Sequence, residues 1–494
     1  MSVLPRRYVT DDDFRKNRPV LVVWETTLAC NLKCLHCGSR AGSARARELS
    51  TQECLEVISQ LARLEVRHVV LIGGETYLRR DWLDLIKAIR DQGMDCSIQT
   101  GGRGLTEDKI RRAAGAGLVS MGVSIDGLEN RHYHLRGVPG SYSQAMAVLG
   151  YLRNCSVPSS VNTQITAGLM PELRELMSRI AEAGAKNWQV QLTVAMGAAS
   201  DRPELLLQPY ELLELMPLLA AVREEALDHD LLMQPGNNIG YFGPYEHEWR
   251  IADDSKGHWQ GCVAGQTSIG IEADGTIKGC PSLPTRSYAG GNVRDLSIEQ
   301  MWNLSEALHF TRERTLSDLW GYCKTCYYAD VCRAGCTWTS HVLFGRPGNN
   351  PYCHYRALQL AKCGLRERLV KVKDADGKPF DHGLFQLVTE STDGRDVGIP
   401  ICHPPKLQRF SSSVVQIEGQ IPQGEGRVPP TLLLCCGCWQ YVMPNSVVCP
   451  HCGGDIEALK LQYDRDLSHA WSATEKLKRL LRNEEQLSAT ETTL

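Results

Sequence analysis

Residues 19–37 read Pro19-Val-Leu-Val-Val-Trp-Glu-Thr-Thr-Leu-Ala-Cys30-Asn-Leu-Lys-Cys34-Leu-His-Cys37. The apolar run over 19–26 predicts a buried strand. A loop with the spacing CxxxCxxC follows this run directly. Three thiolates on one loop can ligate three irons of a cubane cluster, and the fourth iron then stays open to bind a substrate.

A zinc site and free core thiols are the alternatives for this loop. Zinc in structural sites usually has four ligands in paired CxxC knuckles, whereas this loop offers three cysteines with unequal spacing. His36 is available as a fourth ligand. The residues of the loop alone therefore leave the zinc interpretation open.

Beyond the loop, apolar runs alternate with amphipathic stretches. One helix has a clear start signal, because Ser50 and Glu53 form the pattern of a capping box. Six strands alternating with six helices predict an α/β fold, a partial (β/α)6 TIM-like barrel with its site at the C-terminal ends of the strands. The other predicted strands are 68–73, 95–100, 118–125, 159–166 and 187–194, and the helices lie near 51–64, 81–92, 106–116, 141–154, 171–183 and 209–229.

The composition limits the class of protein. A chain of 494 residues predicts two or three domains, since one core stops growing at roughly 250–300 residues. The net charge of −3 and the lack of a long basic run argue against charge-driven binding of nucleic acid or membranes. We find no apolar stretch of about 18 residues and no signal core, which predicts a cytoplasmic protein. Its 20 cysteines then indicate metal ligation rather than disulfides.

Seven cysteines form a second group between 262 and 353. Cys262 is followed by Gly275-Thr-Ile-Lys-Gly-Cys280. The spacing CxxCx5CxxxC comes next, and one further cysteine ends the group. This segment is rich in Gly, Asn and Pro, so it predicts a loop-rich unit organised by metal, with a zinc-rich module as the alternative to iron–sulfur clusters. The later members are Cys323, Cys326, Cys332, Cys336 and Cys353.

The last cysteine group has the spacing CxxC-x10-CxxC. It comprises Cys435, Cys438, Cys449 and Cys452, and it predicts a zinc-ribbon-like segment with a structural zinc ion. A rubredoxin-type iron is the alternative. Few basic residues surround it, which favours a docking or capping role over nucleic-acid binding. The six remaining cysteines are Cys54, Cys96, Cys155, Cys363, Cys402 and Cys436. Most of them are expected to be buried apolar residues, and Cys402 or Cys363 could be an additional metal ligand.

The first loop and the strands and helices after it resemble the radical S-adenosylmethionine (SAM) superfamily over roughly residues 19–195. The resemblance implies that Cys30, Cys34 and Cys37 hold a 4Fe–4S cluster whose open iron is chelated by SAM. It further implies that electron transfer into SAM yields a 5′-deoxyadenosyl radical. His36 stands where this family places a ring against the adenine.

The same resemblance predicts the SAM pocket. Gly73-Gly74-Glu75 matches the GGE motif, whose carboxylate and backbone bind the amino group of SAM; Thr76-Tyr77 departs from the usual residues after it. Ser124 and Asp126, with Thr100 nearby, are predicted to line the ribose and methionine side of SAM. Gln164 and Gln191, on the two later strands, are predicted to contact the adenosine. Strand-end turn chemistry is the alternative for these residues.

The seven-cysteine group resembles the SPASM extension of that superfamily. The resemblance implies two auxiliary 4Fe–4S clusters, so that three are expected in all. Auxiliary cluster I would have an open iron or a ligand from elsewhere, because the eighth cysteine of some relatives is absent near Lys256. The implied ligands are Cys262, Cys280 and Cys336 for auxiliary cluster I, and Cys323, Cys326, Cys332 and Cys353 for auxiliary cluster II.

Relatives with this extension mature ribosomally made peptides and proteins, as the pyrroloquinoline-quinone and mycofactocin maturases do. We therefore expect a peptide substrate that is oxidatively modified or crosslinked. Tetrapyrrole side-chain chemistry, sulfatase-type maturation and a non-catalytic zinc-ribbon interaction protein are the alternatives. A flavodoxin or ferredoxin would supply low-potential electrons, and a leader sequence would be bound by a separate protein or by residues 370–494. Possible pocket residues, also explained by core packing, are Tyr77, Trp188 and Tyr241.

These patterns divide the chain into six predicted segments: an N-terminal extension at 1–18, a radical SAM core at 19–235, a SPASM domain at 236–365, a linker or small β-rich element at 366–430, a zinc-ribbon-like segment at 431–465, and a C-terminal helix and tail at 466–494.

Overall fold

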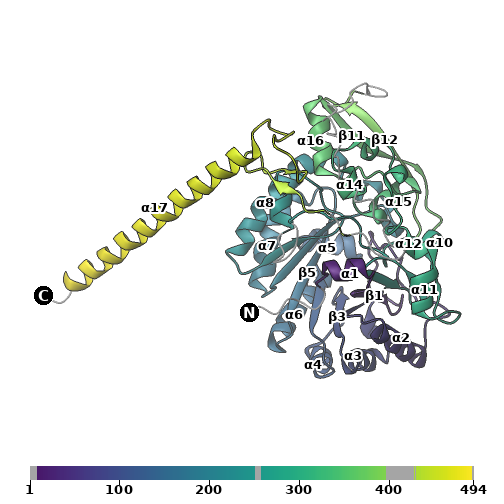
Figure 1. The fold of residues 1–494 in the computed structure, drawn as a ribbon. Helices are drawn as coiled ribbons and strands as arrows, with labels where there is room; N and C mark the ends of the chain where they lie inside the picture. Colours follow the sequence, from purple (N-terminus) through teal and green to yellow (C-terminus); the bar gives the residue numbers. More distant parts are fainter. Residues whose placement is uncertain (1–7, 251–256, 396–427, 429, 492–494) are drawn as a thin grey trace. The chain divides into compact units, whose positions relative to one another are not determined.

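The computed structural model describes residues 8–250, 257–395, 428 and 430–491. The chain divides into two compact units (Figure 1). The larger unit comprises residues 1–241 and 259–430, and the smaller one comprises 242–258 and 431–494. Residues 242–258 therefore group with the C-terminal segment, although the sequence predicts them within the SPASM domain.

The larger unit is built on six parallel strands that pair in chain order, as the sequence predicts. Leu21 of the first strand lies opposite His68 of the second, and the strands carry fully buried apolar residues such as Trp24 and Val190. The strands are β1 (Leu21–Glu25), β2 (His68–Ile72), β3 (Asp95–Thr100), β4 (Ser120–Ser124), β5 (Ser159–Ile165) and β6 (Asn187–Leu192).

Helices follow these strands and cover the sheet (Figure 1). The predicted capping box is confirmed, since Ser50 Oγ accepts a hydrogen bond from the Glu53 backbone and the Glu53 carboxylate accepts one from the Ser50 backbone. One helix that the sequence does not predict, α5 (Glu129–Arg136), follows β4. The other helices are α1 (Asp11–Arg15), α2 (Thr51–Arg63), α3 (Trp82–Asp91), α4 (Glu107–Gly115), α6 (Ser141–Asn154), α7 (Leu173–Glu182) and α8 (Leu212–Leu227).

The sheet extends beyond the six predicted strands at both ends. A parallel strand, β7 (Leu232–Pro235), is added to β6. On the other side β8 (Ser268–Ile271) pairs in parallel with β1, and β9 (Thr276–Lys278) and β10 (Gly291–Asn292) continue antiparallel. Strands β8 and β9 lie between Cys262 and Cys280 in the sequence. The start of the second cysteine group therefore belongs to the same sheet as β1, the strand that precedes the CxxxCxxC loop.

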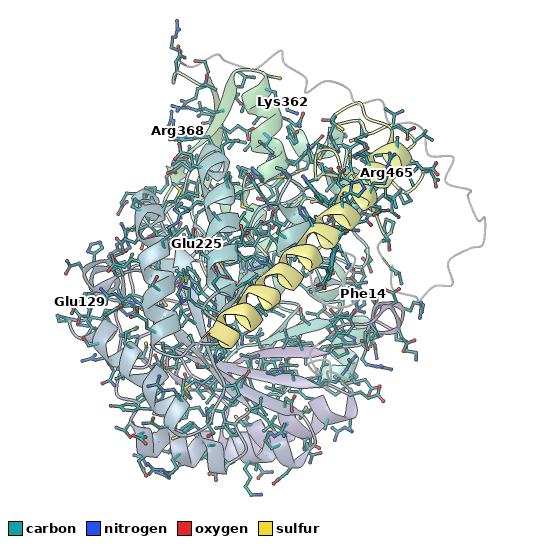
Figure 2. The ribbon with its side chains drawn as sticks, turned by 90° about the vertical axis from the view of Figure 1, so that its left-hand side faces the viewer. Phe14, Glu129, Glu225, Lys362, Arg368 and Arg465 are labelled. Atoms are coloured by element: carbon teal, nitrogen blue, oxygen red, sulfur yellow. The ribbon has the colours of Figure 1, made fainter. Side chains whose placement is uncertain are left out.

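Short helices make up the remainder of the cysteine-rich segment. They are followed by an antiparallel hairpin, β11 (Leu365–Lys373) and β12 (Leu384–Ser391), within the stretch expected to be a linker or a small β-rich element. In Figure 2, Lys362 marks the end of the helix before this hairpin and Arg368 marks β11. The helices are α10 (Thr285–Tyr288), α11 (Ile298–Leu304), α12 (Glu306–His309), α13 (Tyr322–Thr325), α14 (Ala329–Cys332), α15 (Thr337–Phe344) and α16 (His354–Lys362).

One helical stretch, Pro203–Leu227, is long and apolar enough to cross a membrane by length and composition alone. Half of its apolar window is buried inside the protein. Its main helix, α8, packs against α7 and α16 and buries Leu215 and Leu219 completely. Such burial is typical of a core helix of a folded domain.

The smaller unit holds the last cysteine group. Its strands β13 (Leu433–Leu434) and β14 (Tyr441–Val442) pair antiparallel, and the short helix α9 (Glu246–Trp249) comes from the inserted segment. The predicted polar C-terminal helix is present, but α17 (Ile456–Glu491) begins ten residues before the expected start at 466. It starts this early because Ile456 and Leu459 pack on the core of the cysteine group.

Candidate functional site

The CxxxCxxC loop follows β1 and is held by backbone contacts on both sides. Lys33 N donates to Arg136 O over 3.0 Å, and Gly74 N donates to Thr27 O over 2.7 Å. A Cβ added to Gly74 would lie 2.0 Å from the carbonyl oxygen of Ala29. Gly74 is therefore required, because any larger residue would prevent the end of β2 from lying this close to the CxxxCxxC loop.

The three predicted cluster thiols lie close enough to influence one another. Burial raises the pKa of Cys30 to about 12, and the neighbouring Glu75, Cys34 and Cys37 raise it further against the effect of a backbone hydrogen bond. Each sulfur accepts a hydrogen bond, from Leu32 N, Arg136 Nη1 and Ala41 N respectively. A bound metal ion stabilises the deprotonated form of such thiols, because it compensates the charge of the thiolate. Hydrogen bonds to sulfur are a feature of iron–sulfur sites.

Glu75 lies beside this loop with its side chain completely buried. Its carboxylate accepts hydrogen bonds from Thr100 Oγ1 and, over 2.7 Å, from Gly101 N at the end of β3. Burial raises the pKa of Glu75 to about 7. Within the described part of the chain, no cationic nitrogen lies within 4.0 Å of this carboxylate. A buried acceptor without a cationic partner fits the amino group of SAM.

Asp126 is the centre of a buried ion-pair network at the end of β4. Its Oδ2 lies 3.1 Å from His36 Nε2 and 2.5 Å from Arg136 Nη2, and its Oδ1 accepts from Gln164 N over 3.0 Å. Burial alone would raise the pKa of Asp126, but the Arg136 guanidinium and the hydrogen bond with His36 outweigh it and hold the pKa well below its usual range. The carboxylate therefore orients His36 and Arg136, the second of which contacts Cys34.

The remaining SAM-pocket predictions concern half-buried residues on adjacent strands. Gln164 and Gln191 lie directly opposite each other in the β5–β6 register, and Ser124 ends β4. His36 Nδ1 is buried and has no hydrogen-bond partner among the described residues, which fits contact with a ligand. The structure thus brings these groups to one edge of the sheet, and their contacts with SAM stay predictions.

The possible pocket residues have structural contacts. Tyr77 OH donates to Arg103 O and accepts from Asn31 of the CxxxCxxC loop over 3.2 Å. Trp188 is fully buried and donates to Thr163 Oγ1 over 2.9 Å, as a packed core residue does. Tyr241 OH donates to the Asn237 carbonyl and accepts from Cys336 N over 3.0 Å, so it supports a cysteine of the second group.

The three predicted ligands of auxiliary cluster I, Cys262, Cys280 and Cys336, lie near one another. Burial raises the pKa of Cys280 to about 11, and Cys262 raises it further. Burial, together with Cys262 and Cys280, raises the pKa of Cys336 to about 12. Cys262 and Cys280 border a buried cluster that includes Tyr288. The geometry therefore fits one three-cysteine site, as expected for auxiliary cluster I.

The other four SPASM cysteines form a second group. Burial raises the pKa of Cys326 well above its usual value, with further increases from Cys323 and Cys353. Burial raises the pKa of Cys332 in the same way, and all three of the others add to the effect. Four neighbouring thiols, of which Cys323 and Cys332 are buried and Cys326 and Cys353 half-buried, fit the full ligand set expected for auxiliary cluster II.

The C-terminal cysteines form a tight four-sulfur site. All four Sγ atoms lie within 4.8 Å of one another, with 3.8 Å between Cys435 and Cys452 and 3.7 Å between Cys438 and Cys449. Tetrahedral ligands about 2.3 Å from zinc are about 3.8 Å apart. Of the other cysteines, Cys54 and Cys96 are buried, whereas Cys155, Cys363 and Cys436 are half-buried and Cys402 lies outside the described residues.

The described residues of the inserted segment, 242–250, 257 and 258, belong to this smaller unit. His247 stacks on Trp439 with ring centroids 5.1 Å apart, and Tyr441 OH donates to Gly257 O over 2.7 Å. His258 Nε2 accepts from Leu432 N over 3.1 Å. The four-cysteine segment therefore folds together with a part of the chain that lies far from it in sequence.

Arg136 is the residue at the site that sequence reasoning misses. Its position in the sequence, at the end of a short polar stretch after Asp126-Gly127, does not reveal a role at the site. The helix that carries it, α5, has little amphipathic pattern because most of its residues are polar, so periodicity does not predict it. Its role at the site emerges only from its contacts with Asp126 and Cys34.

Comparisons with known proteins agree with this geometry. Residues 24–180 match the model of the radical SAM superfamily, and residues 262–327 match the iron-sulfur cluster-binding domain SPASM. The chain is 28% identical over 351 residues to an AdoMet-dependent heme synthase of Methanosarcina barkeri, covering 69% of this chain and 97% of the relative. It is 27% identical over 358 residues to a PqqA peptide cyclase of Rhizobium meliloti, covering 71% and 89%.

Among solved structures, SuiB of Streptococcus suis bound to precursor peptide SuiA superposes with a TM-score of 0.54 at 16% identity, covering 66% of this chain and 74% of SuiB. This likeness concerns the fold. The two matched domains imply SAM and 4Fe–4S clusters as the cofactors. The chain therefore carries a radical SAM domain over residues 24–180 and a SPASM domain over residues 262–327, and it is a radical SAM enzyme.

Proposed function

We propose that this enzyme oxidatively modifies a ribosomally synthesised peptide, forming a crosslink or a related bond. The observation that carries the proposal is the complete second cysteine group, in which three and four thiols gather as two separate sites. A similar protein, the PqqA peptide cyclase, is named for a peptide substrate. The heme synthase is equally similar in sequence, so tetrapyrrole modification is the second candidate.

The residues of the first site have distinct roles in this proposal. Cys30, Cys34 and Cys37 hold the SAM-binding cluster, and Glu75 accepts hydrogen bonds from the amino group of SAM. When bound and reduced, this pair of cofactors supplies a 5′-deoxyadenosyl radical that removes a hydrogen atom from a C–H bond. Asp126 fixes His36 of the cluster loop and also Arg136, which contacts Cys34.

The remaining cysteines divide between electron transfer and structure. Cys262, Cys280 and Cys336 would hold auxiliary cluster I, and Cys323, Cys326, Cys332 and Cys353 would hold auxiliary cluster II. Clusters bound there would supply an acceptor for the second electron of an oxidation. A flavodoxin or ferredoxin in the cytoplasm provides the low-potential electron that starts the reaction. A structural zinc ion binds the four C-terminal cysteines, whose sulfurs have tetrahedral spacing.

The test uses anaerobically purified protein with its iron–sulfur clusters reconstituted. It is incubated with SAM, dithionite and each short peptide encoded beside its gene, and in parallel with coproporphyrin-type tetrapyrroles. The proposal predicts a peptide that has lost two hydrogen atoms, with one methionine and one 5′-deoxyadenosine released per modification. A tetrapyrrole that loses carboxyl groups, with the peptides unchanged, would contradict it.

A further inference from the structure

One face of the parallel sheet carries polar residues from β4 to β7. On β5 and β6, buried residues alternate with residues that keep accessible surface; Trp188 and Val190, for example, are buried on either side of the exposed Gln189. On β7 the buried Met233 likewise precedes the exposed Gln234. Successive side chains of a strand point to opposite faces, so the buried residues share one face and the accessible residues the other. We call the accessible face of β4 to β7 the polar face.

The register of the strands aligns four residues of the polar face in one row. Ser124 of β4 is paired with Asn162 of β5. Asn162 is paired with Gln189 of β6, which in turn is paired with Gln234 of β7. Neighbouring strands are about 4.8 Å apart, so this polar row is about 14 Å long, which matches about four residues of an extended peptide.

The polar row begins beside the predicted SAM pocket, because Ser124 is predicted to line the ribose side of SAM. Gln164 N, two residues beyond the row on β5, donates to Asp126 Oδ1 over 3.0 Å, and Asp126 contacts His36 of the CxxxCxxC loop. Two residues of a strand span about 7 Å. The part of the row on β6 and β7 therefore lies beside the predicted SAM pocket.

The glutamines of the polar row are accessible and unpaired. Neither Gln189 nor Gln234 has a side-chain hydrogen bond to another described residue, and both are exposed. Asn162 differs, because its Nδ2 donates to Gln99 Oε1, which reaches it across Gly122 of β4. A Cβ on Gly122 would overlap the amide of Gln99. The amides on β6 and β7 are therefore the ones available to a ligand.

The residues of the polar face favour a neutral ligand. No acidic or basic residue occurs on this face of β4 to β7, strands that the structure describes in full. A side-chain amide offers a carbonyl acceptor and N–H donors, so it is complementary to the backbone amides of a peptide. A carboxylate removed from water beside neutral amides lacks the cation that would compensate its charge. The face therefore fits an uncharged peptide segment better than a tetrapyrrole with several carboxylates.

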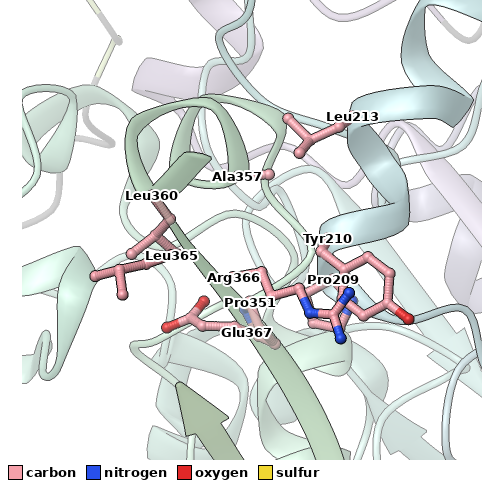
Figure 3. A pocket seen from close by; sticks show the side chains of 9 residues that line it. All are labelled: Pro209, Tyr210, Leu213, Pro351, Ala357, Leu360, Leu365, Arg366 and Glu367. Atoms are coloured by element: carbon pink, nitrogen blue, oxygen red, sulfur yellow. The ribbon is translucent and has the colours of Figure 1, made fainter. Parts of the chain in front are cut away.

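A pocket elsewhere in the larger unit is too small for such a segment. It lies between α8, α16 and β11, with Leu213, Leu360 and Arg366 among its lining residues (Figure 3). Its volume of about 10 Å³ is about the least that holds one water molecule. This pocket therefore offers no alternative site for a peptide.

We propose that Gln189 and Gln234 select an extended, uncharged segment of the peptide substrate by hydrogen bonding to its backbone, and that the polar face disfavours polycarboxylate substrates. Backbone carbonyls of the segment accept from the glutamine Nε2 atoms, and its N–H groups donate to the Oε1 atoms. The inference rests on the proposed function, because the segment would be the part of the peptide next to the modified residue. The two glutamines determine specificity and take no part in the chemistry.

The experiment selects 12-residue peptides from a display library on the anaerobic, cluster-loaded protein with SAM, and counter-selects on the double variant Gln189→Leu/Gln234→Leu. Affinities are then measured for the enriched peptides and for a coproporphyrin, with the unaltered protein, the single and double Leu variants, and Gln189→Lys/Gln234→Lys. Gln52→Leu is the matched control, because Gln52 is an exposed glutamine on α2, outside the sheet. Iron content and circular dichroism verify that each variant is folded.

The proposal predicts enriched peptides that share an uncharged segment. Gln189→Leu and Gln234→Leu should each weaken their binding about threefold to tenfold, because each removes neutral hydrogen bonds, and Gln52→Leu should leave it unchanged. The double Lys variant should bind the coproporphyrin about tenfold more tightly than the unaltered protein does, because it supplies cations for the carboxylates.

The proposal is overturned if no peptide is enriched over the counter-selection, or if the enriched peptides share a charged segment. It is also overturned if the unaltered protein binds the coproporphyrin as tightly as the double Lys variant does, since the neutral face would then not discriminate against carboxylates.

Binding in this experiment does not depend on turnover, so the two proposals can fail separately. A peptide that the enzyme modifies, and that the double Leu variant binds as tightly as the unaltered protein does, would overturn the role of the polar row alone. Enriched peptides that depend on Gln189 and Gln234, without any peptide being modified, would overturn the proposed function alone.

Discussion

Arg136 donates a hydrogen bond from Nη1 to Sγ of Cys34 over 3.6 Å. The same guanidinium is fixed by Asp126, so its position relative to the cluster loop is set by a buried ion pair. A cation that donates to a cluster sulfur stabilises the reduced, more negative cluster. This hydrogen bond therefore predicts that Arg136 raises the reduction potential of the SAM-binding cluster.

Arg136→Gln should lower the reduction potential of the SAM-binding cluster. Loss of one charged hydrogen bond, about 1.5–3 kcal/mol, corresponds to roughly 65–130 mV for a one-electron couple. EPR-monitored redox titration of the anaerobic protein measures the shift. Arg136→Lys should recover part of the potential, and an unchanged potential in Arg136→Gln would show that Arg136 serves packing only.

Glu75→Gln should weaken SAM binding by about tenfold to a hundredfold, because a carboxylate acceptor of a charge-assisted hydrogen bond is lost. Equilibrium dialysis with labelled SAM measures the affinity, and iron content should stay unchanged. Since burial raises the pKa of Glu75 to about 7, binding to the unaltered protein should weaken as the pH falls below 7 and the carboxylate takes up a proton. A SAM affinity equal to that of the unaltered protein would remove Glu75 from the site.

Cys326→Ala should remove auxiliary cluster II and leave about four iron atoms fewer per chain, as expected for one cubane cluster. Iron analysis and Mössbauer spectra after anaerobic reconstitution measure the loss. Cys155→Ala is the control, because Cys155 is a half-buried cysteine outside all three predicted cysteine groups. Equal iron content in both variants would contradict the ligand assignment.

Cys449→Ser should abolish zinc binding, since structural zinc sites gain about 10–16 kcal/mol from a complete ligand set. Elemental analysis measures zinc, and limited proteolysis should then cut within 431–456. Cys436→Ser should keep both zinc and protease resistance, because Cys436 is outside the four-sulfur site. If Cys449→Ser retained the metal, the four-cysteine site would not be the zinc site.

Much of the larger unit can be predicted from sequence because its signals are local. Strand-length apolar runs and the capping box at Ser50 depend on neighbouring residues, and the spacing of the cysteines reflects the geometry of the loops that carry them. The six core strands are therefore predicted within a few residues of their observed bounds.

The missed features depend on contacts between distant parts of the chain. The pairing of β1 with β8 and the packing of His247 on Trp439 join segments that no local pattern connects. Arg136 acquires its role only when α5 is placed against the CxxxCxxC loop. The pairing of β12 with β11 and its packing against α15 likewise depend on tertiary structure, because alternation within a strand does not show which neighbours it has.

The central claim is that the thiol triad of the first loop holds the cluster that cleaves SAM. The most direct measurement is the 5′-deoxyadenosine formed by the reduced, anaerobic protein when Cys30, Cys34 and Cys37 are all replaced by alanine. The account predicts that cleavage stops while the iron of the other two clusters stays bound. Formation of 5′-deoxyadenosine at the rate of the unaltered enzyme would contradict it.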